Sequence, residues 1–190
     1  MIKQLLAVGV MGGLAGVAQA QEADVHQYPG PYLGGALMHN TLGLEVAGQG
    51  TVDTDDWGGQ VIAGYRFSPW VAIEGSYANA GSYGFSDGRT GFTYDPRLLA
   101  ISGVLSLPVA DGLSVFGRLS AVRWDADVVL DDGRFIDYGT ANGTDVGYGI
   151  GAQYASGPLA TRISYDVVDM GDDGTNFKLK QLALAIIWKF

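Results

Sequence analysis

An alternation of apolar with polar or small residues limits this chain to a small set of folds. In the segment 159–167, Ile163 and Tyr165 lie on one face, and Arg162, Ser164 and Asp166 lie on the other. Successive side chains of a β-strand point to opposite faces, so this period of two indicates strands with one apolar face. Eight segments are predicted to be strands: 32–39, 60–67, 70–77, 98–107, 113–122, 146–154, 159–167 and 179–190.

The connections between the predicted strands are alternately short and long. Three are turns rich in Gly, Pro, Ser and Asp, at 68–69, 108–112 and 155–158. Four are long and polar, at 41–57, 78–95, 124–145 and 168–176. An even number of strands closes with antiparallel neighbours, and short turns on one rim with long loops on the other are typical of outer membrane barrels. The pattern predicts an all-β protein: an eight-stranded antiparallel transmembrane β-barrel with short periplasmic turns and long extracellular loops.

The composition of the second face indicates which side of the barrel meets the membrane. That face carries charged residues, Ser and many of the 30 glycines, which suits a narrow interior that few side chains fill. Aromatic residues near strand ends suit membrane girdles: Tyr32, Phe67, Trp70, Tyr154, Trp188 and Phe190. We therefore expect the apolar face to point outward to lipid. A soluble, lipocalin-like barrel with its apolar face around a ligand is the alternative.

The N-terminus has the pattern of an export signal. Lys3 supplies a positive charge, residues 5–17 are apolar and uncharged, and Ala18-Gln19-Ala20 presents the small residues that a signal peptidase requires. Residues 1–20 are therefore predicted to be a signal peptide and residues 21–190 one outer membrane β-barrel domain. Such a chain is exported through the periplasm to the cell outer membrane. The sequence has no cysteine, so no disulfide holds the domain together.

The net charge of -9 and the residue content argue against several functions. Nucleic acid binding requires a basic face, which an acidic chain does not offer. Catalysis is not expected, because His26 and His39 are the only histidines and no G-x-S-x-G motif occurs. Aspartates cluster in the long loops, as at Asp131-Asp132, without the full EF-hand pattern. Solvated surface charge is favoured over Ca²⁺ binding, and no metal site or cofactor is predicted.

Four stretches carry a resemblance to a known family. They are residues 31–36 (PYLGGA), residues 64–77 (GYRFSPWVAIEGSY), residues 107–113 (LPVADGL) with 118–119 and 124–127, and residues 153–155 with 160–163. These stretches resemble the transmembrane domain of the outer membrane protein A family and its single-barrel relatives. The resemblance implies an eight-stranded barrel whose C-terminal aromatic residue, here Phe190, is recognised by the barrel-assembly machinery. The predicted strands leave no residues for the periplasmic peptidoglycan-binding domain of longer family members, so a peptidoglycan tether is not expected.

The resemblance further implies a charged cluster in the barrel interior, in which a Glu of the third strand lies between Arg residues of other strands. Glu74, Arg118 and Arg162 match these positions by local motif, and strand parity also places them on the polar face. Three positions depart from the family pattern: Gln153, where Glu is common, and Ala36 and Val104, where Lys is common. The cluster is either the gate of a narrow pore or an ion pair that satisfies buried charges. The small interior of an eight-stranded barrel favours the ion pair.

Four cations near the rim of the long loops form a second candidate site. Extending the parity of each strand places them on the lipid-facing side: Arg97, Arg123, Lys178 and Lys180. Arg and Lys bind phosphate, so these residues are expected to contact outer membrane lipids and the phosphates of lipopolysaccharide. Snorkelling of the side chains to water is the alternative.

The predicted function is that of an integral outer membrane β-barrel protein with a structural and surface role. It would stabilise the envelope and present its loops to an extracellular partner that the sequence does not identify. A narrow gated, porin-like channel for ions or small solutes is the alternative, and a soluble ligand-carrying barrel is a more remote one.

Overall fold

The computed structural model describes residues 28–46, 50–86, 91–131, 136–172 and 175–190. The predicted signal peptide, residues 1–20, and His26 lie outside these ranges. The described residues form nine β-strands: β1 (Gly30–Val46), β2 (Gly50–Arg66), β3 (Val71–Asn79), β4 (Tyr83–Ser86), β5 (Gly91–Ala110), β6 (Leu113–Asp131), β7 (Ile136–Ser156), β8 (Leu159–Asp172) and β9 (Thr175–Lys189). No helix in the described ranges is long and apolar enough to cross a membrane.

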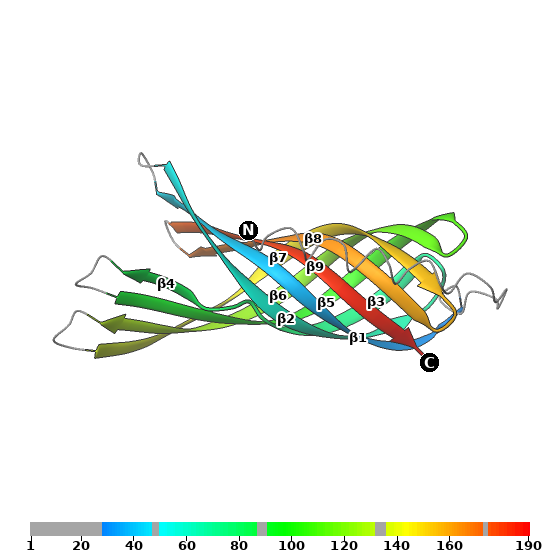
Figure 1. Cartoon of the computed structure of the whole chain (residues 1–190), viewed down its shortest axis with the longest axis horizontal. Helices are drawn as coiled ribbons and strands as arrows, with labels where there is room; N and C mark the ends of the chain where they lie inside the picture. The colour runs from blue at the N-terminus through cyan, green and yellow to red at the C-terminus, as the bar shows by residue number, and fades with distance from the viewer. Residues whose placement is uncertain (1–27, 47–49, 87–90, 132–135, 173–174) are drawn as a thin grey trace, which may run out of the picture.

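The strands close into a barrel, as Figure 1 shows. Neighbouring strands pair in antiparallel fashion from β3 through β2 and β1 to β9, and onward through β8, β7 and β6 to β5. The pairing of β3 with β5 completes the circuit, so eight strands of the described chain form the wall. The short β4 continues the line of β3 along β5 beyond a break at residues 80–82. The prediction of an eight-stranded antiparallel barrel is confirmed.

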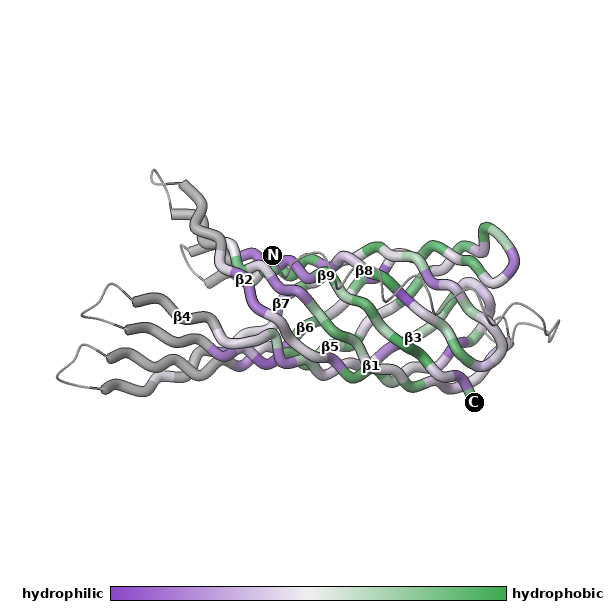
Figure 2. Tube along the Cα trace, in the orientation of Figure 1, coloured by the Kyte–Doolittle hydropathy of each residue, from purple (hydrophilic) through white to green (hydrophobic). Residues whose placement is uncertain are grey.

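The apolar face of the wall points outward. Burial alternates along β3, where Val71, Ile73 and Tyr77 are exposed and Glu74 is buried. Large apolar residues such as Ile101, Leu119 and Ile150 lie more than 60% exposed on the outer surface, and Figure 2 shows hydrophobic residues concentrated along the barrel wall. Such a surface is stable in lipid and unfavourable in water. A ligand carrier with its apolar faces inside has the opposite arrangement, so the soluble alternative is wrong.

Aromatic residues surround the end of the barrel that carries the short turns. Phe67, Trp70, Tyr154, Trp188 and Phe190 are each at least 48% exposed. Their rings reach outward from strand ends, where Trp and Tyr of membrane proteins lie at the level of the lipid headgroups. This end, which also holds the C-terminus in Figure 1, is therefore the periplasmic end.

The long connections predicted to be loops are largely strands. β6 and β7 stay paired without a register shift from Val122↔Asp145 to Asp131↔Ile136, and β1 and β2 stay paired to Val46↔Gly50. In Figure 1 these hairpins protrude from the end opposite the C-terminus. The alternation that reveals a strand in the sequence arises where one face meets lipid. Outside the membrane both faces meet water, so the backbone ladder continues without that signal.

We expect the folded protein to resist SDS at room temperature and to migrate differently from a boiled sample in gel electrophoresis. The reason is that backbone N–H and C=O groups of the barrel wall pair within a closed sheet, and detergent offers them no competing partner. Identical migration of heated and unheated samples would contradict a closed barrel.

Candidate functional site

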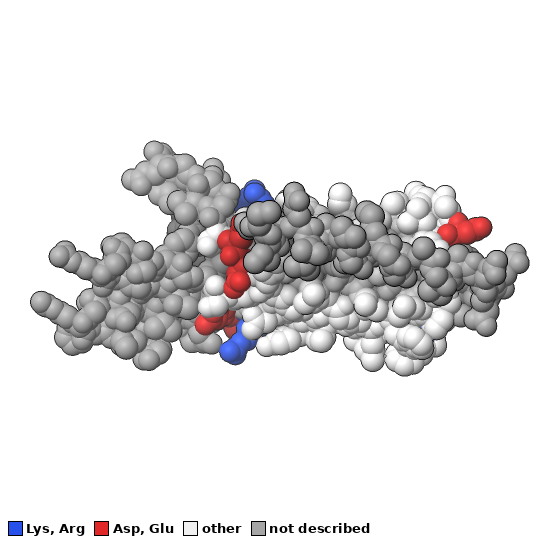
Figure 3. Space-filling view, viewed as in Figure 1, with Lys and Arg blue, Asp and Glu red and all other residues white. Residues whose placement is uncertain are grey.

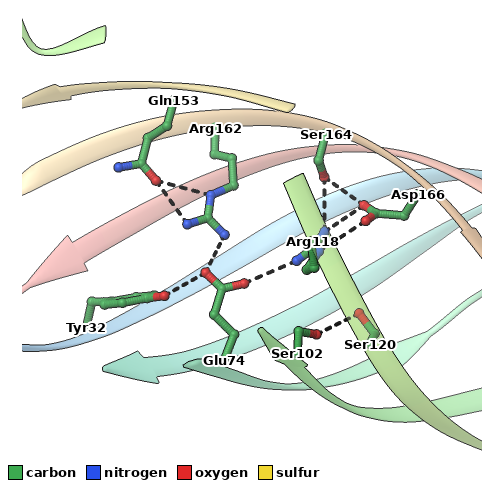
Figure 4. Close-up of polar contacts among 9 residues, drawn as sticks. All are labelled: Tyr32, Glu74, Ser102, Arg118, Ser120, Gln153, Arg162, Ser164 and Asp166. Carbon is green, nitrogen blue, oxygen red and sulfur yellow. Dashed lines mark hydrogen bonds and ion pairs between the residues drawn. The ribbon is translucent and has the colours of Figure 1, made fainter. Parts of the chain in front are cut away.

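A cluster of buried charges crosses the interior of the barrel (Figure 4). Glu74 of β3, Arg118 of β6 and Arg162 of β8 all have the inward parity of their strands. Glu74 Oε1 lies 2.6 Å from Arg162 Nη1, and Glu74 Oε2 lies 3.2 Å from Arg118 Nη1. The Glu74 side chain is 1% exposed and the two Arg side chains are 3% and 7% exposed. The single carboxylate therefore bridges two cations that are almost fully removed from solvent.

A second carboxylate, which the sequence interpretation did not include, completes the cluster. Asp166 of β8 accepts two hydrogen bonds from Arg118, of 3.1 Å from Nε and 2.6 Å from Nη2, and a third of 2.9 Å from Ser164 Oγ. Gly149 faces this side chain, and a Cβ there would lie 1.9 Å from Asp166 Oδ1. The two carboxylates and two guanidinium groups have a formal charge of zero. In the sequence, Asp166 lies an even number of residues from Arg162 and therefore on the same face of the strand. This alternation could have placed Asp166 in the interior before the structure was known.

Tyr32 belongs to this cluster and not to the aromatic girdle, so its assignment to the girdle was wrong. It is only 2% exposed, and its hydroxyl donates a 2.7 Å hydrogen bond to Glu74 Oε1. Gly64 pairs with Tyr32 across β1 and β2, and a Cβ at Gly64 would lie 2.3 Å from Tyr32 Cζ. An aromatic residue near a strand end fits either face. The glycine across the ladder provides the space that admits this one to the interior.

Gln153 and Phe116 hold the other side of Arg162. The Gln153 amide oxygen accepts hydrogen bonds from Arg162 Nε at 3.2 Å and Nη2 at 3.0 Å. The guanidinium carbon lies 4.8 Å above the centroid of the Phe116 ring, a cation–π distance. Each of the three guanidinium nitrogens of this buried cation thus donates a hydrogen bond, although Gln153 supplies no charge.

A small cavity borders the cluster inside the barrel. It has a volume of about 30 Å³ and lies on the extracellular side of the cluster, lined by Arg118, Asp166 and Ser102 among others. Ser102 and Ser120 share a 2.8 Å hydrogen bond nearby. A buried water requires roughly 10–15 Å³ of such volume, so the cavity has room for about two or three waters. Ala36 and Val104, where the family often has Lys, are buried beside the cluster and add no charge.

The four cations predicted to face lipopolysaccharide lie on the outer surface. Arg97, Arg123 and Lys178 are exposed and Lys180 is partly exposed. Arg123 Nε lies 3.8 Å from Asp125, and Lys178 Nζ lies 3.6 Å from Asp169. Figure 3 shows charged side chains gathered in a band next to a barrel wall that is largely uncharged.

The two residue types considered for catalysis and metal binding, histidine and the loop aspartates, are placed as follows. His39 lies on the outward parity of β1, with its ring 5.2 Å from that of Trp57 in an edge-to-face arrangement. Among the described residues, no cluster of three or more His, Cys, Asp or Glu side chains is placed to hold a metal ion. Of the loop aspartates, Asp132 and Asp173 lie outside the described ranges.

Comparison with known proteins identifies the family. A family model described as "Outer membrane protein beta-barrel domain" matches residues 6–190. The chain belongs to this family. Outer membrane protein A of Shigella flexneri is 28% identical over 199 residues, which cover 100% of this chain and 56% of that protein. Outer membrane protein A of Serratia marcescens is 29% identical over 92% of this chain and 52% of that protein. The chain thus spans about half the length of the curated relatives it matches.

Solved structures of outer membrane barrels have the same fold. Neisserial surface protein A superposes with a TM-score of 0.62 at 16% identity, over 84% of this chain and 97% of that chain. Ail, the attachment invasion locus protein of Yersinia pestis, superposes with a TM-score of 0.59 at 17% identity, over 86% of this chain and 100% of that chain. At such identities the likeness concerns the fold alone. Family membership and fold together place this β-barrel in the outer membrane.

Proposed function

We propose that this protein is a structural, surface-exposed barrel of the outer membrane whose interior is closed. The observation that carries the proposal is the ion pair between Glu74 and Arg162, which joins β3 to β8. These strands lie four steps apart in the eight-stranded circuit, on opposite walls. Tyr32 and Gln153 extend the bonded set to β1 and β7. Charges that pair with one another hold the opposite walls together.

A narrow gated channel is the alternative function. In that case the same charges would form a gate, and the small cavity beside Arg118 would be part of the path. Recordings in planar lipid bilayers separate the two functions. We expect neither the wild type nor Glu74→Ala to produce channel openings above the current of the bare bilayer. Ser102→Ala, which removes a lumen hydrogen bond without changing charge, is the matched control. Discrete openings that Glu74→Ala makes more frequent would support the gate instead.

The protruding hairpins are the part of the protein proposed to contact molecules outside the cell. β1–β2, β5–β6–β7 and β8–β9 extend beyond the charged band and would meet an extracellular partner of unidentified chemistry. The proposed role is non-enzymatic. Phe190, 70% exposed at the end of the chain described, is proposed to be the residue that the barrel-assembly machinery recognises during insertion.

The four outward cations are proposed to contact lipopolysaccharide. Arg97, Arg123, Lys178 and Lys180 lie on the lipid-facing side of β5, β6 and β9 near the extracellular rim, where phosphates of the outer leaflet lie. Arg presents a fork of donors to phosphate and Lys a point charge. The nearby carboxylates of Asp125 and Asp169 moderate this attraction.

Changing all four cations to Gln should remove most of the stabilisation that lipopolysaccharide gives to the folded protein. The measurement compares folding into liposomes with and without lipopolysaccharide, followed by the gel shift between folded and unfolded forms. Liposomes without it serve as the control, because the variant should fold there as the wild type does. If lipopolysaccharide stabilises wild type and variant equally, the contact does not exist.

A further inference from the structure

A second part of the barrel interior is filled by apolar side chains. Six inward residues from five strands are each at most 4% exposed there and are called the apolar seal below: Met38, Leu42, Leu98, Val122, Val168 and Leu179. Four of them line the small cavity that Arg118 and Asp166 also line, namely Met38, Leu98, Val122 and Val168. The cavity therefore lies between two barriers of different chemistry, one charged and one apolar.

The apolar seal lies nearer the extracellular end of the barrel than the charged cluster does. On β6, Val122 follows Arg118 by four residues in the direction of the protruding hairpin, and on β8 Val168 follows Arg162 by six. At about 3.3 Å per residue, these offsets are roughly 13 and 20 Å along the strands. The two barriers thus share no residue and are separated along the lumen.

Hydrogen bonds between amide groups join the walls beside the apolar seal. Gln181 Nε2 donates to Asn40 Oδ1 at 3.1 Å, and Asn40 Nδ2 donates to the carbonyl oxygen of Ala80 at 2.8 Å. Asn40 lies between Met38 and Leu42 on the inward side of β1, and both Asn40 and Ala80 are 0% exposed. These bonds connect β9, β1 and the segment that follows β3. They involve no residue of the charged cluster, so loss of an ion pair there leaves them in place.

Trp124 packs against the buried apolar residues at the extracellular end of the lumen, two residues beyond Val122. Its Nε1 donates a 2.6 Å hydrogen bond to Asp145 Oδ2. Gly143 pairs with Trp124 across β6 and β7, and a Cβ at Gly143 would lie 2.7 Å from Trp124 Cζ2. The glycine gives the ring room to lie across the strand. A large ring, whose polar atom is already bonded, thus narrows the way to the apolar seal.

We propose that the apolar seal is a second closure of the barrel, which stops ions even when the charged cluster is broken. This inference rests on the proposed closed interior and adds a separate barrier to it. The six side chains carry no charge, and a hydrophobic constriction blocks ions because water does not fill it. An ion that reached the cavity after loss of Glu74 would have to give up its water to go further, which is costly. Glu74→Ala alone is therefore expected to leave the barrel closed.

Recordings in planar lipid bilayers test whether the two closures act separately. Leu98→Ser with Leu179→Ser removes two apolar side chains of the seal from β5 and β9, four steps apart in the circuit. Combined with Glu74→Ala, this pair should produce channel openings, whereas the pair alone and Glu74→Ala alone should produce none above the bare bilayer. The matched control in the Glu74→Ala background is Leu99→Ser with Leu182→Ser, which makes the same exchange on the same strands at outward positions, 55% and 48% exposed. The gel shift between heated and unheated samples verifies that each variant is folded.

A milder pair keeps the test decisive if the Ser pair does not fold. Val122→Thr with Val168→Thr nearly retains the shape of each side chain and adds a hydroxyl group, so it should also permit openings in the Glu74→Ala background. If the folded seal variants stay silent, or if the outward control opens as they do, the apolar seal is not the barrier. Openings of Glu74→Ala alone, with a silent wild type, would overturn the second closure and leave the closed interior of the wild type in place. Openings of the wild type itself would overturn both.

Discussion

Replacing Glu74 with Ala is expected to lower the free energy of unfolding by about 3–5 kcal/mol. The change removes the charge that neutralises Arg162, whose remaining partners, Gln153 and the Phe116 ring, carry none. Arg118 keeps Asp166 and is affected less. An unpaired cation is costly where the side chain is only 3% exposed, as that of Arg162 is. Water that enters the space left by the Glu74 side chain would reduce the loss of unfolding free energy. Reversible urea unfolding in lipid vesicles gives the measurement.

Two controls make this prediction specific to burial. Lys178→Ala breaks an ion pair whose side chains are 53% and 51% exposed, and should cost no more than about 1 kcal/mol because solvent screens it. Glu74→Leu combined with Arg162→Met removes both charges and should cost far less than Glu74→Ala alone. If the double variant is as unstable as the sum of its single variants, the two residues are not coupled.

Placing Arg at Ile186 should destabilise the folded barrel by about 2–4 kcal/mol if the residue lies near the middle of the bilayer. Ile186 is 58% exposed on the outer face of β9, between the exposed Leu184 and Trp188. A guanidinium group there meets hydrocarbon and has no water within reach. Urea unfolding in lipid vesicles measures the difference in the free energy of unfolding between the variant and the wild type.

The control for Ile186 is a second position on the same face at another depth. Phe190 lies four residues beyond Ile186 on the same outward file, 70% exposed at the periplasmic end, and Phe190→Arg should cost only about 0–1 kcal/mol because its side chain reaches the interface. Ala185→Arg faces the lumen, 3% exposed, and should disturb packing without this depth dependence. Equal losses for Ile186→Arg and Phe190→Arg would contradict a lipid-facing wall with a central hydrocarbon zone.

Much of the barrel could be predicted because each wall strand meets lipid on one side and the lumen on the other. Ile163 and Tyr165 point outward and Arg162 and Asp166 inward in both the sequence pattern and the structure. The protruding hairpins could not be predicted in this way. Where β6 and β7 leave the membrane, water meets both faces and the alternation fades, although the backbone pairing of Asp131 with Ile136 continues.

The residue pattern by itself determined the eight strands of the barrel wall and the direction of their faces, because burial in lipid selects apolar residues at every second position. The contacts inside the barrel were decided only by the tertiary structure. Arg162 and Glu74 are 88 residues apart, and Tyr32 and Glu74 are 42 apart. Their meeting depends on the register of every intervening strand pair and on closure between β3 and β5. Parity specifies that a side chain points inward. The height at which it meets a partner is set by the sum of those registers, which no local pattern encodes.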